Sequence, residues 1–235
     1  MNADLLEISD GRFYNLNDMV KAGCHDCDGC SECCQGMGDS ILLDPYDMYQ
    51  LSGNLHMSFE QLLTGPVELH MEEGLILPNL AMQPFEGEAE GGRKRLVKTP
   101  QVSGEACSFL NEEGRCSIHA FRPGLCRLFP LGRNYEEGRM NYFLLTHECP
   151  AAGKSKVKVS KWLGVDRIRD YQSFLIRWHD LSKRMRAEVT ADPEAVESNK
   201  RTCMMFLQFF YARPYTSGDF FREFAERAEK LESLL

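Results

Sequence analysis

The feature that most constrains this chain is a block of five cysteines within eleven residues, CHDCDGCSECC, at positions 24–34. Two of these cysteines, Cys33 and Cys34, are adjacent in the sequence. A block of this kind serves as a disulfide staple, as a redox-active pair or as part of a metal site. The rest of the chain discriminates among these three uses.

The setting of the block argues against a disulfide staple. With 235 residues, the chain is long enough to bury a core without covalent cross-links. Its first residues lack the basic start and apolar run of a secretory signal, and no stretch of about 18 apolar residues indicates a membrane span. We therefore expect a cytoplasmic protein, and in a reducing compartment clustered cysteines are more often metal ligands or redox groups than disulfides.

Two further uses are disfavoured by local sequence and by charge. A catalytic C-x₂-C pair normally opens a helix that follows a strand, and the segment before Cys24 shows no strand pattern. The net charge of −8 argues against a nucleic-acid partner, because such a partner requires many basic contacts to phosphates. A metal site is the remaining interpretation, and a protein substrate or protein partner is the expected macromolecular contact.

Patterns along the chain predict an α+β fold in two parts. Residues 1–150 hold nine of the ten cysteines and are expected to form a small cysteine-rich metal-binding module of short strands and helices. Residues 151–235 are expected to be helical, either separate or packed as one unit with the module, with Cys203 buried on an apolar helix stripe. The expected elements are helices at 44–53 and 58–65, a hairpin at 67–80, a polar loop at 86–94, a strand at 93–99, one long helix at about 160–189, and helices beginning near 192 and 217.

A second group of cysteines follows at positions 107, 116, 126 and 149. The segment CSFLNEEGRCSIH, residues 107–119, predicts two short strands around a turn. If Leu110 pairs with Arg115, then Cys107 and Cys116 share one face as a diagonal pair, with Cα atoms about 7 to 8 Å apart. This separation is too large for an unstrained disulfide, so a metal centre fits the pair better.

The first block offers two ligand registers. One is C-x₂-C-x₂-C-x₃-C, the spacing that bacterial ferredoxins use for cubane iron–sulfur clusters, although Gln35 stands where that motif has proline. It is formed by Cys24, Cys27, Cys30 and Cys34. The other register, C-x₂-C-x₂-C-C, begins at Cys27 and ends on the adjacent pair.

The second register and three later features together resemble a known family. These features are ILLDPYD after the block, CSFLNEEGRCSIHAFRPGLCRLFPL at residues 107–131, and Cys149. They are similar to the CxxCxxCC, or YkgJ-type, cysteine-cluster family, which is regarded as a zinc- or iron-chelating domain, and the resemblance covers residues 24–149. It implies a metal site of eight cysteines with Cys24 as a further candidate; the eight are Cys27, Cys30, Cys33, Cys34, Cys107, Cys116, Cys126 and Cys149.

The metal and the function stay open at this point. An iron–sulfur cluster, expected to be of the 4Fe–4S type, suits a loop of closely spaced cysteines, whereas tetrahedral zinc is the alternative. Arg122 and Arg127 lie near Cys126 in the sequence, and we expect them to offset thiolate charge or, with Tyr135, to line a substrate pocket.

Two functional hypotheses remain. Some family members are identified as flagellin lysine N-methylases that use an iron–sulfur cluster and S-adenosylmethionine, so the resemblance implies a lysine methyltransferase-like enzyme. This chain lacks the Gly-rich turn of Rossmann-type methyltransferases. The alternative is a non-enzymatic redox carrier, metal-handling accessory or structural zinc module.

Overall fold

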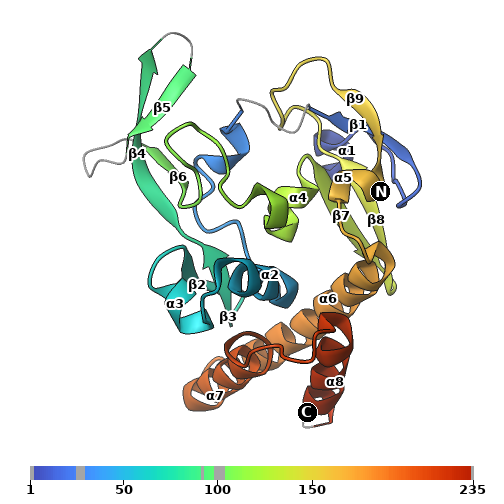
Figure 1. Ribbon diagram of the computed structural model, residues 1–235. Coiled ribbons are helices and arrows are strands. Elements are labelled where there is room, and N and C mark those ends of the chain that lie inside the picture. Colours follow the sequence, from blue (N-terminus) through green and yellow to red (C-terminus); the bar gives the residue numbers. More distant parts are fainter. Residues whose placement is uncertain (1–2, 25–29, 91–92, 98–103, 234–235) are drawn as a thin grey trace. The chain divides into compact units, whose positions relative to one another are not determined.

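The computed structural model describes residues 3–24, 30–90, 93–97 and 104–233 (Figure 1). The chain is an α+β protein, and its described residues form two compact units that alternate along the sequence. Unit 1 comprises Met1–Gly38 and Met82–Ile168, and unit 2 comprises Asp39–Ala81 and Arg169–Leu235. The expected division into a cysteine-rich module at residues 1–150 and a helical part at residues 151–235 stays a prediction. Among the described residues, no helix is both long and apolar enough to cross a membrane.

Unit 1 is built from short elements that carry the cysteine-rich segments. These are α1 (Ala3–Ile8), β1 (Met19–Gly23), the 3₁₀ turn η2 (Glu32–Cys34), β4 (Met82–Glu90), β5 (Arg93–Val97), β6 (Gly104–Cys107), the 3₁₀ turn η3 (His119–Phe121), α4 (Gly124–Leu128), β7 (Leu131–Glu136), β8 (Arg139–Leu144), β9 (Ser155–Lys158) and α5 (Val159–Leu163). All strand pairs are antiparallel: β1 with β9, β7 with β8, and β4 with both β5 and β6. The segment before β1 also bridges β8, through Tyr14 opposite Tyr142.

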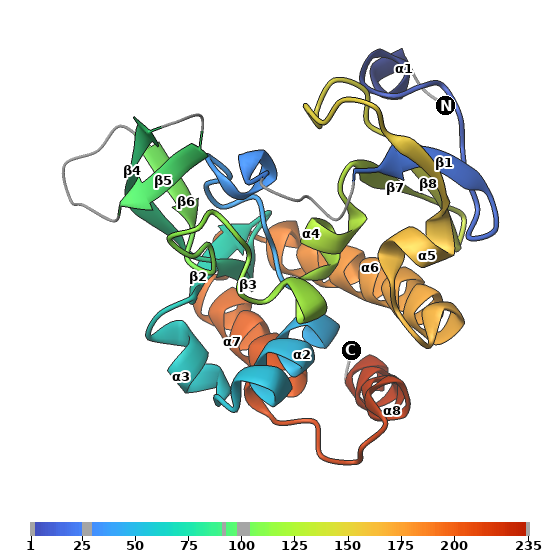
Figure 2. The same cartoon turned by 45° about the horizontal axis from the view of Figure 1, so that its top comes forward.

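Unit 2 joins a hairpin and two short helices to the C-terminal helices. Its elements are α2 (Pro45–Leu55), α3 (Phe59–Leu63), β2 (Val67–Glu72), β3 (Leu75–Leu80), α6 (Ile168–Ala191), α7 (Val196–Leu207), the π-helix η4 (Gln208–Ala212) and α8 (Phe220–Glu232), with Ile168 itself assigned to unit 1. Helix α7 lies beside β3 of the hairpin (Figure 2). The core is aromatic, and Phe206, Phe210 and Phe224 are almost completely buried.

Two of the local signals for helix starts are confirmed in unit 2, whereas the start expected near residue 192 was wrong, because α7 begins at Val196 after Ala195, whose side chain forms no cap. Asp44 caps α2 and forms a reciprocal capping box with Asp47, and Ser58 does the same for α3 with Gln61. The predicted hairpin is present as β2 and β3, and the helix expected to begin near residue 217 is present as α8, which begins at Phe220. Cys203 is 3 % exposed in α7, as the apolar stripe predicted.

Two predicted helix ends were wrong. Helix α2 continues past Gly53 to Leu55 and ends where His56 adopts the left-handed conformation, with φ of 56°. The single helix expected at about 160–189 is divided into α5 and α6, because Gly164 takes a left-handed φ of 59° and ends α5. A left-handed residue thus ends each helix, His56 in α2 and Gly164 in α5, and Gly53 lies inside α2.

Two strand predictions were also wrong. Residues 86–94 were expected to be a loop, but β4 runs to Glu90 and pairs with β5, in a register from Glu86↔Val97 to Glu90↔Arg93. A ladder needs only backbone donors and acceptors, so a polar sequence does not prevent it. No strand was expected before Cys24, yet β1 ends at Gly23 and pairs antiparallel with β9.

Candidate metal centre

The end of the first cysteine block is attached to β6 by backbone hydrogen bonds. Gly36 N donates to Glu105 O at 2.9 Å, and Gly38 N donates to the Glu105 carboxylate at 2.7 Å. Gln35 forms an isolated bridge with Ala106, the residue before Cys107. These contacts hold residues 35–38, which follow Cys34, against Glu105 and Ala106, which precede Cys107. Cys34 packs against the buried side chain of Ala106.

The second cysteine segment has a different register from the predicted one. Leu110 was expected to pair with Arg115 but lies opposite Cys116. Ser117 N also donates to Phe109 O at 2.9 Å. The Asn111 side chain accepts from the backbone N–H of Glu113 and of Arg115, which sets the length of the turn. Cys107 ends β6, and residues 108–109 form a turn in which Leu110 N donates to Cys107 O at 2.9 Å. The strand expected from Cys107 to Leu110 is therefore absent, and the diagonal strand pairing predicted for Cys107 and Cys116 was wrong.

Cys126 lies on the five-residue helix α4, after the 3₁₀ turn η3. Arg122 precedes this helix, and its guanidinium contacts the imidazole of His119. Arg122 also lies close enough to Cys33 and Cys116 to favour the thiolate form of both. This placement is the one expected for a basic residue beside a thiol-rich site.

The pKa values of the adjacent cysteines Cys33 and Cys34 change in opposite directions. A hydrogen bond with the Cys34 thiol, aided by Arg122, lowers the pKa of Cys33 to about 7. The same hydrogen bond, burial and the negative charges of Cys33, Cys126 and Cys107 raise the pKa of Cys34 well above its usual range. Burial raises the pKa of the Cys116 thiol, and Arg122 partly offsets that effect. Cys33 and Cys34 thus share a proton within a group of interacting thiols.

Five of the predicted ligands are brought together by this geometry. They come from three stretches of unit 1 and comprise Cys33, Cys34, Cys107, Cys116 and Cys126. Cys24, Cys30 and Cys149 are partly buried, whereas the predicted ligand Cys27 lies outside the described residues. Across the described part of the chain, no three Cys, His, Asp or Glu side chains meet closely enough to hold an ion as they stand. The thiols are neighbours without closing on one point.

Arg127 makes contacts that the sequence did not predict. Its guanidinium donates to four backbone carbonyls: Ala120 O, Arg122 O, Leu163 O and Gly164 O, at 3.2 to 3.4 Å. Two of these carbonyls belong to the end of α5. Sequence reasoning missed this contact, because the residues of α5 contain no cysteine and lie beyond the cysteine blocks.

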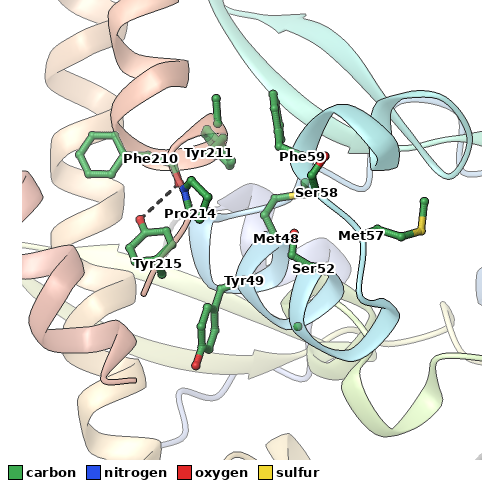
Figure 3. Close-up of a pocket in the computed structure, with 12 residues that line it drawn as sticks. Met48, Tyr49, Ser52, Met57, Ser58, Phe59, Phe210, Tyr211, Pro214 and Tyr215 are labelled. Carbon is green, nitrogen blue, oxygen red and sulfur yellow. Dashed lines mark hydrogen bonds between the residues drawn. The ribbon is translucent and has the colours of Figure 1, made fainter. Parts of the chain in front are cut away.

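A separate pocket lies within unit 2 and has a volume of about 230 Å³. Figure 3 shows Met48 and Tyr49 of α2, Phe59 of α3 and Tyr211 of the π-helix around it. None of its lining residues is a cysteine, and none is Arg122, Arg127 or Tyr135. The predicted substrate pocket beside the cysteines therefore does not correspond to this cavity.

A family comparison identifies the chain. The CxxCxxCC family model, described as a putative zinc- or iron-chelating domain, matches residues 26–150, which are more than half of the sequence. The chain belongs to the CxxCxxCC family. This assignment supports metal binding by the domain. No curated protein and no solved structure matches the chain.

The boundaries of the CxxCxxCC match bear on the cysteines and on α5. The matched range includes eight cysteines and leaves out Cys24 and Cys203. It ends at residue 150, before β9 and α5 begin. The helix end that Arg127 contacts therefore lies outside the family domain but inside unit 1.

Proposed function

We propose that this CxxCxxCC protein binds a thiolate-ligated metal centre in unit 1 and that the centre is an iron–sulfur cluster. The observation that carries the proposal is the association of five thiols from distant parts of the chain around the Cys33–Cys34 pair. In a protein without disulfides at these positions, such a group of thiols suits a soft metal. The proposed ligands are drawn from Cys27, Cys30, Cys33, Cys34, Cys107, Cys116, Cys126 and Cys149.

The chemistry of the donor set fits iron–sulfur clusters and zinc, because both take cysteine thiolates. Five interacting thiols exceed the four ligands that either a tetrahedral zinc ion or a four-iron cluster takes, so it is the close spacing of the first block that favours a cluster. When bound, a cluster of this kind supplies one-electron transfer. Arg122 would offset the negative charge of the thiolates, and the attachment of residues 35–38 to Glu105 would hold the first block near Cys107.

Binding would also displace the proton shared by the adjacent cysteines. The pKa of Cys33 is lowered to about 7, so its thiolate is already populated near neutral pH, whereas the raised pKa of Cys34 favours its protonated form. Recruiting Cys34 as a ligand would therefore release a proton and draw the neighbouring thiols toward one centre.

The test is anaerobic purification followed by visible absorption, iron, sulfide and zinc analysis. We expect the protein to show a broad absorption band at about 400 nm and to contain stoichiometric iron and sulfide, because thiolate-to-iron charge transfer absorbs in this range. A colourless protein with stoichiometric zinc would replace the cluster with a zinc site. A protein free of both metals would refute the proposed function.

Variants locate the site within the protein. Cys30→Ser and Cys116→Ser are expected to lose at least half of the bound metal, because each removes a proposed ligand. Cys203→Ser is the matched control, since Cys203 is buried in α7 of unit 2 and its thiol contacts Gly74 O at 3.3 Å. Equal metal content in all three variants would contradict the proposed ligand set.

A lysine methyltransferase-like activity is a second proposal that rests on the family resemblance alone. Its test is calorimetric titration of the metal-loaded protein with S-adenosylmethionine. Saturable binding would favour the enzyme, and the absence of binding would leave a redox carrier, metal-handling accessory or structural module.

A further inference from the structure

The segment from Lys154 to Gly164 contains β9, α5 and the residue that ends α5, and it lies beyond the family match. Here it is called the clamp. Its two inward-facing side chains, Val159 and Leu163, are 0 % and 1 % exposed. The clamp is therefore part of the folded core of unit 1. Its own sequence contains no Cys, His, Asp or Glu.

We propose that the clamp fixes three cysteine-bearing segments in position for metal binding and that Arg127 and Trp162 are the positioning residues that join it to the Cys126 segment. The inference rests on the proposed metal site and extends it to residues outside the family domain.

The first segment held by the clamp leads into Cys24. β9 pairs with β1, and Gly23 lies opposite Ser155 at the end of the ladder. A Cβ atom at Gly23 would come within 2.3 Å of Ser155 Oγ and 3.2 Å of Ser155 O, so a larger residue at this position would displace the Ser155 side chain. Further along, Val159 N donates to Asp18 O at 3.0 Å. The backbone is thus fixed up to the residue before the first cysteine.

The second segment is α4, which carries Cys126. The indole N–H of Trp162 donates to Leu128 O at 3.1 Å. Arg127, the residue next to Cys126, donates to Leu163 O at 3.3 Å and to Gly164 O at 3.4 Å. A five-residue helix has little stability of its own, so these contacts set the position of α4.

Arg127 also joins this contact to the turn before α4. Its second nitrogen donates to Ala120 O and Arg122 O, at 3.4 Å and 3.2 Å. One planar guanidinium therefore connects η3, α4 and the end of α5, and a lysine ammonium cannot reproduce that fork. Arg122, whose charge acts on Cys33 and Cys116, is held through its own backbone by the same group.

The third segment carries Cys149. Lys154 Nζ donates to Cys149 O at 2.7 Å and closes the loop between the family domain and the clamp. With all three segments fixed, less conformational entropy would be lost when the thiols bind a metal. Loosening the clamp should therefore weaken metal retention even though every thiol remains present.

The test compares Arg127→Lys and Trp162→Phe with the wild type and with Arg139→Lys, an exposed arginine of β8 in the same unit. The measurement is the rate at which EDTA removes metal from anaerobically purified protein. We expect about tenfold faster removal for Arg127→Lys, the scale typical of lost support around metal ligands, and at least threefold for Trp162→Phe. Arg139→Lys should match the wild type.

Removal rates within threefold of the wild type for both clamp variants would overturn the inference while the metal proposal stands. A general loss of stability is separated by hydrogen exchange in the metal-free proteins: the inference requires faster exchange in β1 and α4, with α8 of unit 2 unchanged. Hydrogen exchange can be measured even if the wild type holds no metal. The absence of metal would refute the proposed function, and unchanged exchange in α4 of the variants would separately refute the clamp.

Discussion

Buried Arg227 forms an ion pair with the partly buried Glu223 beside the π-helix of unit 2. Arg227 is 5 % exposed and also donates to Phe209 O and Arg213 O, at 2.9 and 2.7 Å, and its guanidinium lies 3.8 Å from the ring centroid of Tyr215. Burial alone would raise the pKa of Glu223, but hydrogen bonds from Ser217 and Arg227 outweigh burial and lower it to about 2. These interactions fix the C-terminal end of the π-helix.

The lowered pKa of Glu223 predicts a pH-dependent contribution to stability. Because the folded-state pKa lies below the unfolded value of 4.5, the contribution is complete above pH 4.5 and is lost as the pH falls toward 2. Glu223→Gln should therefore lower the free energy of unfolding by about 2 kcal/mol at pH 7, with the difference shrinking toward pH 2. Urea denaturation across this range measures it, with the exposed Glu226→Gln as control. A difference independent of pH would contradict the assignment.

At the scale of elements, the starts of α2 and α3 were predictable because each depends on a few neighbouring residues, whereas the start expected near residue 192 lies four residues before that of α7. Asp44 and Ser58 cap helices whose own third residues complete the hydrogen bonding. Helix ends were harder, since a glycine is compatible both with a left-handed end and with a helix interior. The register at Cys116 was also missed, because the Asn111 side chain, rather than strand propensity, sets the turn.

A substitution at Gly53 tests whether this glycine lies inside α2 or ends it. It lies inside α2, and a Cβ atom there would meet nothing within 4 Å. Gly53→Ala should therefore raise the free energy of unfolding by about 0.5 to 1 kcal/mol, because alanine has the higher helix propensity. Thermal and urea unfolding measure the change. Gly164→Ala, at a left-handed position, should be destabilising, and a loss of stability in Gly53→Ala would restore the predicted helix end.

At the scale of the whole molecule, the cysteine spacing and the family resemblance led to the candidate ligands, but their association in space could not be read from the sequence. The contacts that position Cys34 and Cys126 involve Glu105, Trp162 and the end of α5, none of which has a recognisable ligand spacing. Long-range backbone contacts of this kind have no local sequence signal. The alternation of the two units along the chain was likewise invisible in composition.

The two units predict an uneven response to metal removal. If the metal centre lies in unit 1, chelation should increase hydrogen exchange at residues 30–38 and 104–128, because their folding is coupled to the ion. Exchange in α2 and α8 of unit 2 should stay within twofold, since their buried cores contain none of the proposed ligands. Mass spectrometry of holo and metal-free protein resolves both regions. Parallel loss of protection everywhere would indicate one cooperative unit instead.

The alternation of the units also has a consequence for biosynthesis. Residues 39–81, which belong to unit 2, separate the first cysteine block from the later ones, and the clamp ends only at Gly164. At about 5 to 20 residues per second, roughly 6 to 25 seconds of translation separate the appearance of Cys34 from that of Gly164. During that interval the nascent thiols are exposed without their later partners. Metal delivery is thus expected to follow, rather than guide, synthesis of the first block, and a ribosome-stalled chain ending before β9 should retain little metal.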